Sequence, residues 1–257
     1  AYMVIGMSSL PPPPPPMPPG GNFAPPPGYV PYGPGGQRGF QPIGQVAKWL
    51  GIVLIASAVG QVLTVLAQIP ERNQQNTNVT IDNLDGTFGL FMLVSLAVAA
   101  ISVAAVVLEV LLAFRMAKNL QVLGRTGAAF SPGACIAVVI LGFCTAGIPP
   151  FFMWRELWAG SDPNVPAYAP NWKSTKVGDI VVANLVLSLL ATVVGLATGV
   201  GSFVARINSS TSSLSDSSNT GAGWLLLSAL VSAASTVVLL FLVRQLSARH
   251  MQATREA

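Results

Sequence analysis

The stretch that decides the fold is Phe88–Phe114, FGLFMLVSLAVAAISVAAVVLEVLLAF, in which Glu109 is the only charged residue. An α-helix rises about 1.5 Å per residue, so about 20 apolar residues cross a hydrocarbon layer ~30 Å thick. The stretch exceeds that length, which a helix accommodates by tilting. The strands of a membrane barrel alternate between polar and apolar side chains, and this stretch does not. We therefore predict a membrane-spanning α-helix.

Three further apolar runs have the same character: Trp49–Ala67, Ile180–Ala205 and Trp224–Val243. Charged residues make up 9% of the 257 residues and apolar residues 52%, whereas soluble domains carry about 25% charged residues. We expect an all-α integral membrane protein with four transmembrane helices, its membrane domain extending over residues 43–246.

A shorter apolar segment lies between the second and third long runs, at residues 134–158. Its first part, Ala134–Ile148, is too short for an untilted crossing and is followed by Pro149 and Pro150. Two prolines cannot stand inside a straight helix, because they remove two donors and clash with the preceding turn. We expect a broken helical segment, which is a fifth span, a re-entrant element or an interfacial one.

The distribution of basic residues predicts the orientation in the membrane. If residues 134–154 do not cross, eleven of the 13 Lys and Arg residues lie on the side that holds both termini. If they do cross, only six lie on the side of the N-terminus. Because Lys and Arg accumulate on the cytoplasmic side, we expect four spans in the plasma membrane with both termini cytoplasmic. The net charge of +4 is spread thinly along the chain, so no nucleic-acid partner is expected.

Residues 1–42 are rich in proline and glycine and include six consecutive prolines, Pro11 to Pro16. Such a sequence has few amide donors and little to bury, so we expect a disordered tail. Extended proline-rich segments dock into aromatic grooves of partner proteins, although this one could equally be a solvated spacer. Residues 247–257 are predicted to form a polar C-terminal tail.

Glu109 is the one full charge deep in a predicted span. A carboxylate there is costly, so it should face the interior and have a partner or a proton. Arg244 and Arg115 are the candidate partners. The residue is interpreted either as a proton or cation site or as half of a buried ion pair that joins two helices.

The segment after the double proline combines large aromatic side chains with charges at Trp154, Arg155, Glu156 and Trp158. Tryptophan and arginine are typical of the headgroup level of a bilayer. We expect these residues to contact membrane lipids or a partner protein.

Small residues at Gly60, Gly195 and Gly199 predict close approach between helices. Glycine and other small residues allow the backbones of membrane helices to come together. They predict a tight bundle and would also suit a homo-oligomer.

The chain offers little for catalysis. His250 is its single histidine, and its two cysteines, Cys135 and Cys144, lie nine residues apart on opposite faces of one apolar segment. A histidine triad, a multi-histidine metal site and a disulfide are therefore not expected. We predict no catalytic residue, metal or cofactor, and no enzyme.

Several short motifs resemble an uncharacterised family of multi-pass membrane proteins common in actinobacteria, the DUF4328 family. The matching residues are Phe114-Arg115 with Asn119, Leu123-Gly124, Ser131-Pro132-Gly133, Pro150, Arg155-Glu156-Leu157-Trp158 and Ser161-Asp162. The resemblance implies the membrane architecture with a proline-rich N-terminal tail, and it implies no activity.

The sequence thus favours a non-catalytic accessory or scaffold subunit, which recruits a partner protein through its tail or its cytoplasmic loops. The alternative is a small transporter or channel that uses Glu109 and the broken helix, because interrupted helices often frame binding sites.

Overall fold

The computed structural model describes residues 39–74, 84–142, 145–208 and 218–256, and these residues form helices and connecting loops. Four helices are long: α1 (Gly44–Gln74), α2 (Leu84–Val122), α5 (Asp179–Asn208) and α6 (Ser218–Thr254). Each contains a stretch long and apolar enough to cross a membrane, at Gly44–Val65, Met92–Val122, Asp179–Ala197 and Leu226–Thr254. The predicted all-α membrane fold with four spanning helices is confirmed.

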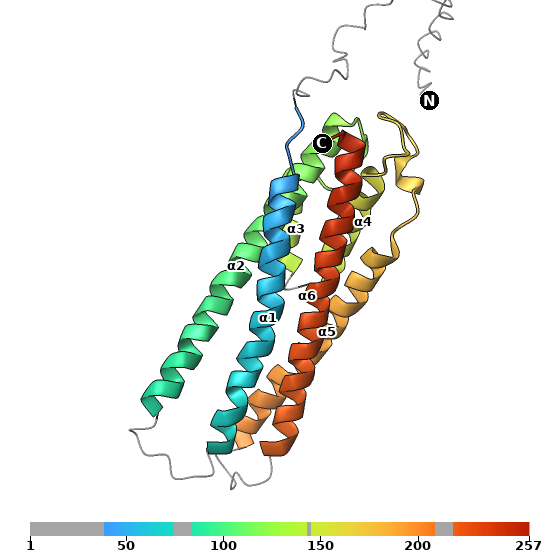
Figure 1. Ribbon diagram of the computed structural model, residues 1–257. Helices are drawn as coiled ribbons and strands as arrows, with labels where there is room; N and C mark the ends of the chain where they lie inside the picture. Colours follow the sequence, from blue (N-terminus) through green and yellow to red (C-terminus); the bar gives the residue numbers. More distant parts are fainter. Residues whose placement is uncertain (1–38, 75–83, 143–144, 209–217, 257) are drawn as a thin grey trace, which may run out of the picture. The chain divides into compact units, whose positions relative to one another are not determined.

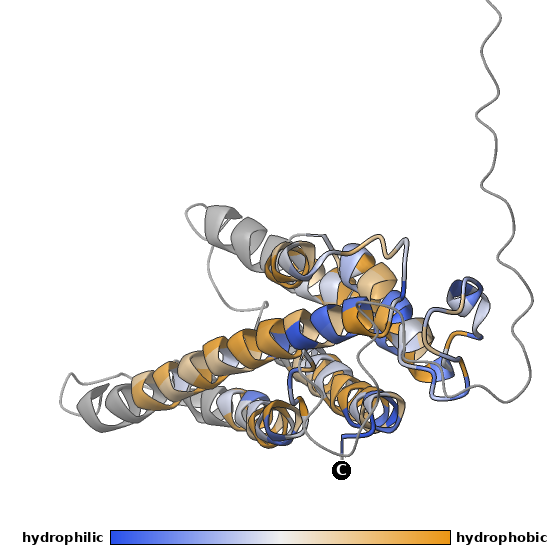
Figure 2. Cartoon of the chain, turned by 90° about the horizontal axis from the view of Figure 1, so that it is seen from above, coloured by the Kyte–Doolittle hydropathy of each residue, from blue (hydrophilic) through white to orange (hydrophobic). Residues whose placement is uncertain are grey.

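The four long helices form a row in the order α2, α1, α6, α5 (Figure 1). Two short helices, α3 (Pro132–Leu141) and α4 (Ile148–Gly160), pack against α2 and α5 respectively, and a 3-10 turn, η3 (Trp172–Ser174), packs on α4. We call the end of the row that holds the connections 123–131 and 161–178 the capped end. The first and last described residues, Gly39 and Glu256, both lie at the capped end. In Figure 2 the apolar colour runs along the helices and hydrophilic residues gather at this end.

The long helices expose large apolar side chains to their surroundings. Leu96 of α2 is 74% exposed and Leu93 is 67% exposed, while α5 exposes Val193 at 62%. Exposed apolar surface is unfavourable in water by about 25 cal/mol per Å², but hydrocarbon chains solvate it without that cost. This outward-facing surface agrees with the membrane fold.

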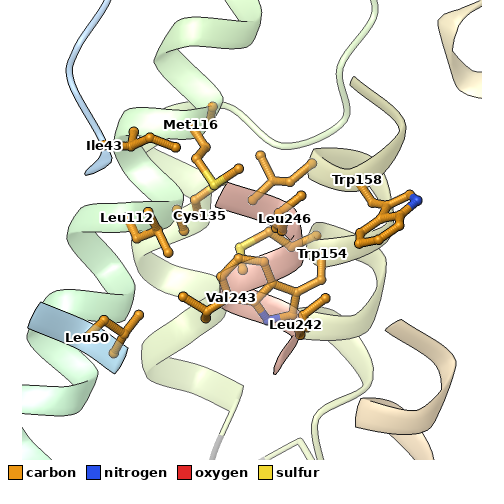
Figure 3. Close-up of a cluster of buried hydrophobic side chains, with 14 of the residues drawn as sticks. Ile43, Leu50, Leu112, Met116, Cys135, Trp154, Trp158, Leu242, Val243 and Leu246 are labelled. Carbon is orange, nitrogen blue, oxygen red and sulfur yellow. The ribbon is translucent and has the colours of Figure 1, made fainter. Parts of the chain in front are cut away.

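A buried core joins the helices in the half of the bundle next to the capped end. Figure 3 shows Leu50 of α1, Leu112 and Met116 of α2, Trp154 of α4 and Leu246 of α6 converging there. Cys135 of α3 completes the contact and is fully buried. Val181 of α5 also belongs to this core, which therefore joins α1, α2, α3, α4, α5 and α6.

The broken segment enters and leaves at the capped end. Trp172 Nε1 donates to the carbonyl of Thr126 at 3.0 Å, and the amide of Tyr168 donates to the carbonyl of Leu123 at 3.1 Å. The connections before α3 and after α4 are therefore joined side by side. The ten residues of α3 rise about 15 Å, half the hydrocarbon thickness. The helical hairpin formed by α3 and α4 thus reaches partway along the bundle and returns.

The break lies before the double proline, and not at it as predicted from the sequence. α3 already ends at Leu141, and residues Ala146 and Gly147 adopt positive φ angles of 52° and 77°. Pro149 and Pro150 occupy the first turn of α4, where a missing amide donor breaks no helical hydrogen bond. The prolines therefore begin the second helix of the hairpin.

The C-terminal end of the described chain differs from the predicted boundary. Residues 247–254, expected in a polar tail, continue α6, because Ser247, His250 and Thr254 are buried on one of its faces. Residues 39–43 precede α1 without being helical, and α1 begins at Gly44, inside the predicted membrane domain. Residues 1–38, which hold the proline run, lie outside the described residues.

Candidate functional site

The buried polar side chains of the described chain concentrate at the capped end, and Asn119 of α2 is central among them. Its Oδ1 accepts a hydrogen bond from the amide of Gln41 at 2.7 Å, and its Nδ2 donates to the carbonyl of Gln41 at 2.9 Å. One side chain thereby satisfies both main-chain groups of Gln41. The pairing also fixes the orientation of the Asn119 amide, since an N–H can only donate and a carbonyl can only accept.

His250 continues this network from α6 and is fully buried. Its Nε2 lies 3.1 Å from Asn119 Nδ2, and its Nδ1 lies 2.8 Å from the hydroxyl oxygen of Ser161. Asn119 Nδ2 can only donate, so His250 Nε2 must accept. The imidazole is therefore neutral, and its Nδ1–H donates to Ser161.

An ion pair lies next to this chain of hydrogen bonds. Arg249 Nη2 is 2.6 Å from Asp162 Oδ2, and Arg249 Cζ lies 5.0 Å from the ring centroid of Trp158. Asp162 Oδ1 also accepts from the amide of Asn164 at 3.0 Å. The aromatic ring and the carboxylate together hold the Arg249 guanidinium at the edge of the bundle.

The residues just after Gln41 are held as well. Arg115 Nη1 donates to the carbonyl of Pro42 at 2.7 Å. The carboxylate of Glu256 accepts from the amides of Ile43 at 3.0 Å and Gly44 at 3.1 Å. The first amides of a helix have no partner within it and carry a partial positive charge, so this carboxylate caps α1.

Arg125 fixes the connection that follows α4. Its side chain is 3% exposed. Its Nε, Nη1 and Nη2 donate to three carbonyls, those of Gly160, Pro166 and Val165, at 3.2, 2.7 and 2.8 Å. The planar guanidinium is suited to this arrangement because its donors point in fixed directions. Arg125 thus positions Ser161 and Asp162 for the contacts described above.

Glu109 lies apart from the network. Its side chain is partly buried on α2. Within the described part of the chain no hydrogen bond or ion pair to it is found. Of its predicted partners, Arg115 donates to Pro42 and Arg244 is exposed. The structure therefore does not bring the predicted pair together.

The predicted interfacial residues divide between core and surface. Trp154 is 1% exposed and packs in the core, so its expected contact with lipid headgroups is corrected. Glu156 Oε1 accepts from the amide of Ala129 at 2.6 Å, and Arg155 is exposed. Trp158 is 8% exposed. The aromatic residues are buried because α4 is enclosed by α2, α3 and α5 instead of lying flat at the surface.

The predicted packing glycines have different surroundings. A Cβ at Gly60 would stand 2.9 Å from Val98 Cγ2, so α1 and α2 approach closely there. A Cβ at Gly195 would meet no described atom within 4 Å. Gly199 lies in a part of α5 where side chains are outside the description.

The sequence interpretation missed His250, which it placed in a polar tail. The signal was its spacing: Val243, Ser247, His250 and Thr254 recur at intervals of three and four residues, as on one face of a helix. Asn119, Ser161 and Asp162 were noted only through the family resemblance. No group of three metal-ligating side chains occurs among the described residues.

Comparisons with protein-family models, with curated proteins and with solved structures found no match to this chain. The resemblance to the DUF4328 family stays a prediction.

Proposed function

We propose that this chain is a non-catalytic interaction subunit of the plasma membrane that presents its proline-rich N-terminal segment to a partner protein on the cytoplasmic side. The observation that carries the proposal is the double hydrogen bond between Asn119 and Gln41. It fixes the chain at the point where the N-terminal segment joins the bundle.

The junction has more hydrogen bonds than the capping of a helix start requires. Asn119 binds Gln41, Arg115 binds Pro42, and Glu256 binds Ile43 and Gly44. Each such hydrogen bond contributes about 1 kcal/mol net, so together they hold the junction in one position. A segment attached at a fixed point stays at a high effective concentration near the surface around it. A subunit that recruits a partner to that surface would use this property.

The orientation follows from the positive-inside rule. The basic residues Lys118 of α2, Arg155 of α4, Lys173 of η3 and Arg255 after α6 lie at the capped end, whereas Arg72 and Arg206 belong to the opposite ends of α1 and α5. The capped end and both termini would then face the cytoplasm. A reporter enzyme that is active only outside the cytoplasm, fused after Ala257, should stay silent, and a strong signal would refute this orientation.

A small transporter or channel is the second candidate, and the observation in its favour is the partly buried Glu109 on α2, the helix against which α3 packs. The tip of the hairpin weighs against it. The amides of Gly147 and Ile148 donate to Gly142 and Thr145, and the next two residues are prolines without a donor. The start of α4 therefore offers no free amide to an anionic substrate.

The proposal is tested with the full chain in its native membrane. A photo-crosslinking residue is placed at Phe23, and the crosslinked proteins are quantified by mass spectrometry. Three variants are compared: replacement of Pro11–Pro16 by glycine and serine, Asn119→Ala, and Asn171→Ala as the control at an exposed asparagine.

We expect one stoichiometric partner that is lost on replacing the prolines, is crosslinked less with Asn119→Ala and is unchanged with Asn171→Ala. Identical crosslinks after proline replacement would refute the proposal. Glu109→Gln should leave the crosslinks unchanged. A separate assay measures proton-coupled uptake of solutes into vesicles that contain the protein. If Glu109→Gln abolishes this uptake without lowering the yield of folded protein, the transporter is supported.

A further inference from the structure

A cleft of about 450 Å³ opens at the capped end, where α4 and α6 end and α5 begins. Trp158, Arg249 and Asp162 line one part of it, and Lys176, Gly178 and Asp179 line another. It lies outside the Asn119–His250 network and plays no part in holding the N-terminal junction. Its walls combine both signs of charge with an aromatic ring.

The charges in the cleft leave one cation and one anion available. Arg249 and Asp162 neutralise each other at 2.6 Å. Lys176 and Asp179 are both exposed, and in the described chain neither is within an ion-pair distance of an opposite charge. A purely anionic ligand would be repelled by Asp179 and a purely cationic one by Lys176. A ligand that carries both charges would match the two side chains.

Trp158 adds a hydrogen-bond donor. Its side chain is 8% exposed, it lines the cleft, and its indole N–H has no hydrogen-bond partner in the part of the chain that is described. Figure 3 shows the indole nitrogen pointing away from the core side chains. Gly178 passes so close to the ring that a Cβ there would overlap it. The ring is largely buried while its N–H points away from the core, so the N–H is available to donate a hydrogen bond to a ligand acceptor in the cleft.

An apolar surface continues from the cleft along the bundle. Val182 and Val186 follow Asp179 on α5 and are 45% and 56% exposed, and Phe152 of α4 is 47% exposed. The α4 and α5 helices pack against each other, so these side chains lie along neighbouring helices. A charged headgroup in the cleft would place its acyl chain on this surface.

We propose that the cleft binds a phospholipid whose headgroup is phosphoethanolamine. The phosphate lies at Lys176 and the indole N–H of Trp158, the ammonium lies at the Asp179 carboxylate, and an acyl chain runs along Val182 and Val186. The primary ammonium can donate hydrogen bonds to Asp179, which a quaternary choline headgroup cannot do. A phosphoglycerol headgroup lacks the cation altogether.

The test uses the full chain purified in mild detergent and examined by native mass spectrometry. Phosphatidylethanolamine, phosphatidylcholine and phosphatidylglycerol with identical acyl chains are titrated separately. We expect the ethanolamine lipid to bind at least about tenfold more tightly than the other two. Equal retention of the three lipids would overturn the proposal, and this measurement on the unaltered chain needs no variant to fold.

Three substitutions then test the assigned contacts. Asp179→Asn removes the charge but keeps a residue suited to a helix start. Lys176→Gln removes the cation, and Trp158→Phe removes the N–H but keeps an aromatic ring. Asp179→Asn should reduce the ethanolamine preference severalfold. Lys176→Gln and Trp158→Phe should weaken the binding of all three lipids severalfold, because each of them carries the phosphate. Lys118→Gln, at an exposed lysine of α2, should leave affinity and preference unchanged. An unaltered preference in Asp179→Asn, or tighter binding of phosphatidylglycerol than of phosphatidylethanolamine by the unaltered chain, would refute the assignment.

Discussion

Asn119 Nδ2 lies 3.1 Å from His250 Nε2, and this contact makes the protonation of a histidine on α6 depend on the main chain at Gln41. The Gln41 carbonyl and amide fix the Asn119 side chain, and Asn119 in turn requires an acceptor at Nε2. A second proton on His250 would place its Nε2–H donor against the Nδ2–H donor of Asn119, which is unfavourable. The junction of the N-terminal segment and the histidine therefore form one hydrogen-bonded unit.

The first prediction concerns the pH dependence of stability. The folded state holds His250 neutral, so on acidification the unfolded state binds more protons and the folded state loses stability. One proton contributes at most about 1.4 kcal/mol per pH unit. Thermal unfolding in detergent between pH 8 and pH 5 should show a steeper loss for the unaltered chain than for His250→Gln. Equal slopes would refute the neutral tautomer.

The second prediction reverses that dependence. Asn119→Asp introduces a carboxylate that still accepts from the Gln41 amide but cannot donate to the Gln41 carbonyl or to His250. Near neutral pH the variant should lose about 1–3 kcal/mol of stability. On acidification a protonated His250 can donate to the new carboxylate, so part of the loss should be recovered. The same unfolding measurements test this, and a steady decline with falling pH would contradict it.

The third prediction concerns the tip of the helical hairpin. Gly147 has φ 77°, and a Cβ there would stand 3.0 Å from Ser188 Cβ on α5. Gly147→Ala should destabilise the protein by about 1–2 kcal/mol, because the left-handed conformation is unfavourable for alanine. Gly133→Ala is the matched control, since a Cβ there meets nothing within 4 Å and helical alanine is favoured over glycine. Equal melting temperatures for the two variants would show that the tip is not packed as described.

The fourth prediction concerns Cys135. Burial, with a smaller contribution from the nearby Glu156 carboxylate, raises the pKa of its thiol to about 12. The thiolate is the reactive form, so the folded protein should resist maleimide at pH 7–8. Labelling is followed by mass spectrometry in a Cys144→Ala background, before and after denaturation. Rapid modification of the folded protein would contradict the burial of Cys135 in the core.

The four spanning helices could be predicted because the bilayer thickness sets a length that an uninterrupted apolar run either reaches or does not. The length and apolar character of Phe88–Phe114 predict a spanning helix, whatever other helices pack against it. The orientation of Trp154 could not be predicted in the same way. A tryptophan beside an arginine is typical of a membrane interface, and only the packing of α4 among other helices places it in the core.

The network at the capped end shows the same limit. Asn119 and His250 are 131 residues apart in sequence, and nothing near either residue indicates the other. The polar side chains at the end of α6 resemble a solvated tail, because composition alone does not show that α1 packs on this helix or that Asn119 and Ser161 bond to it. The spacing of Ser247, His250 and Thr254 indicates that they share one helix face, but not which residues cover that face.

The cap on α1 also sets an order of events during synthesis. Glu256 follows Ile43 by 213 residues, and a ribosome makes the chain from its N-terminus. The first amides of α1 therefore lack this hydrogen-bond partner until every later helix has been synthesised. A chain released before Glu256 would have its spanning segments but a loosened N-terminal junction, so a partner that binds the held junction would distinguish finished chains from unfinished ones.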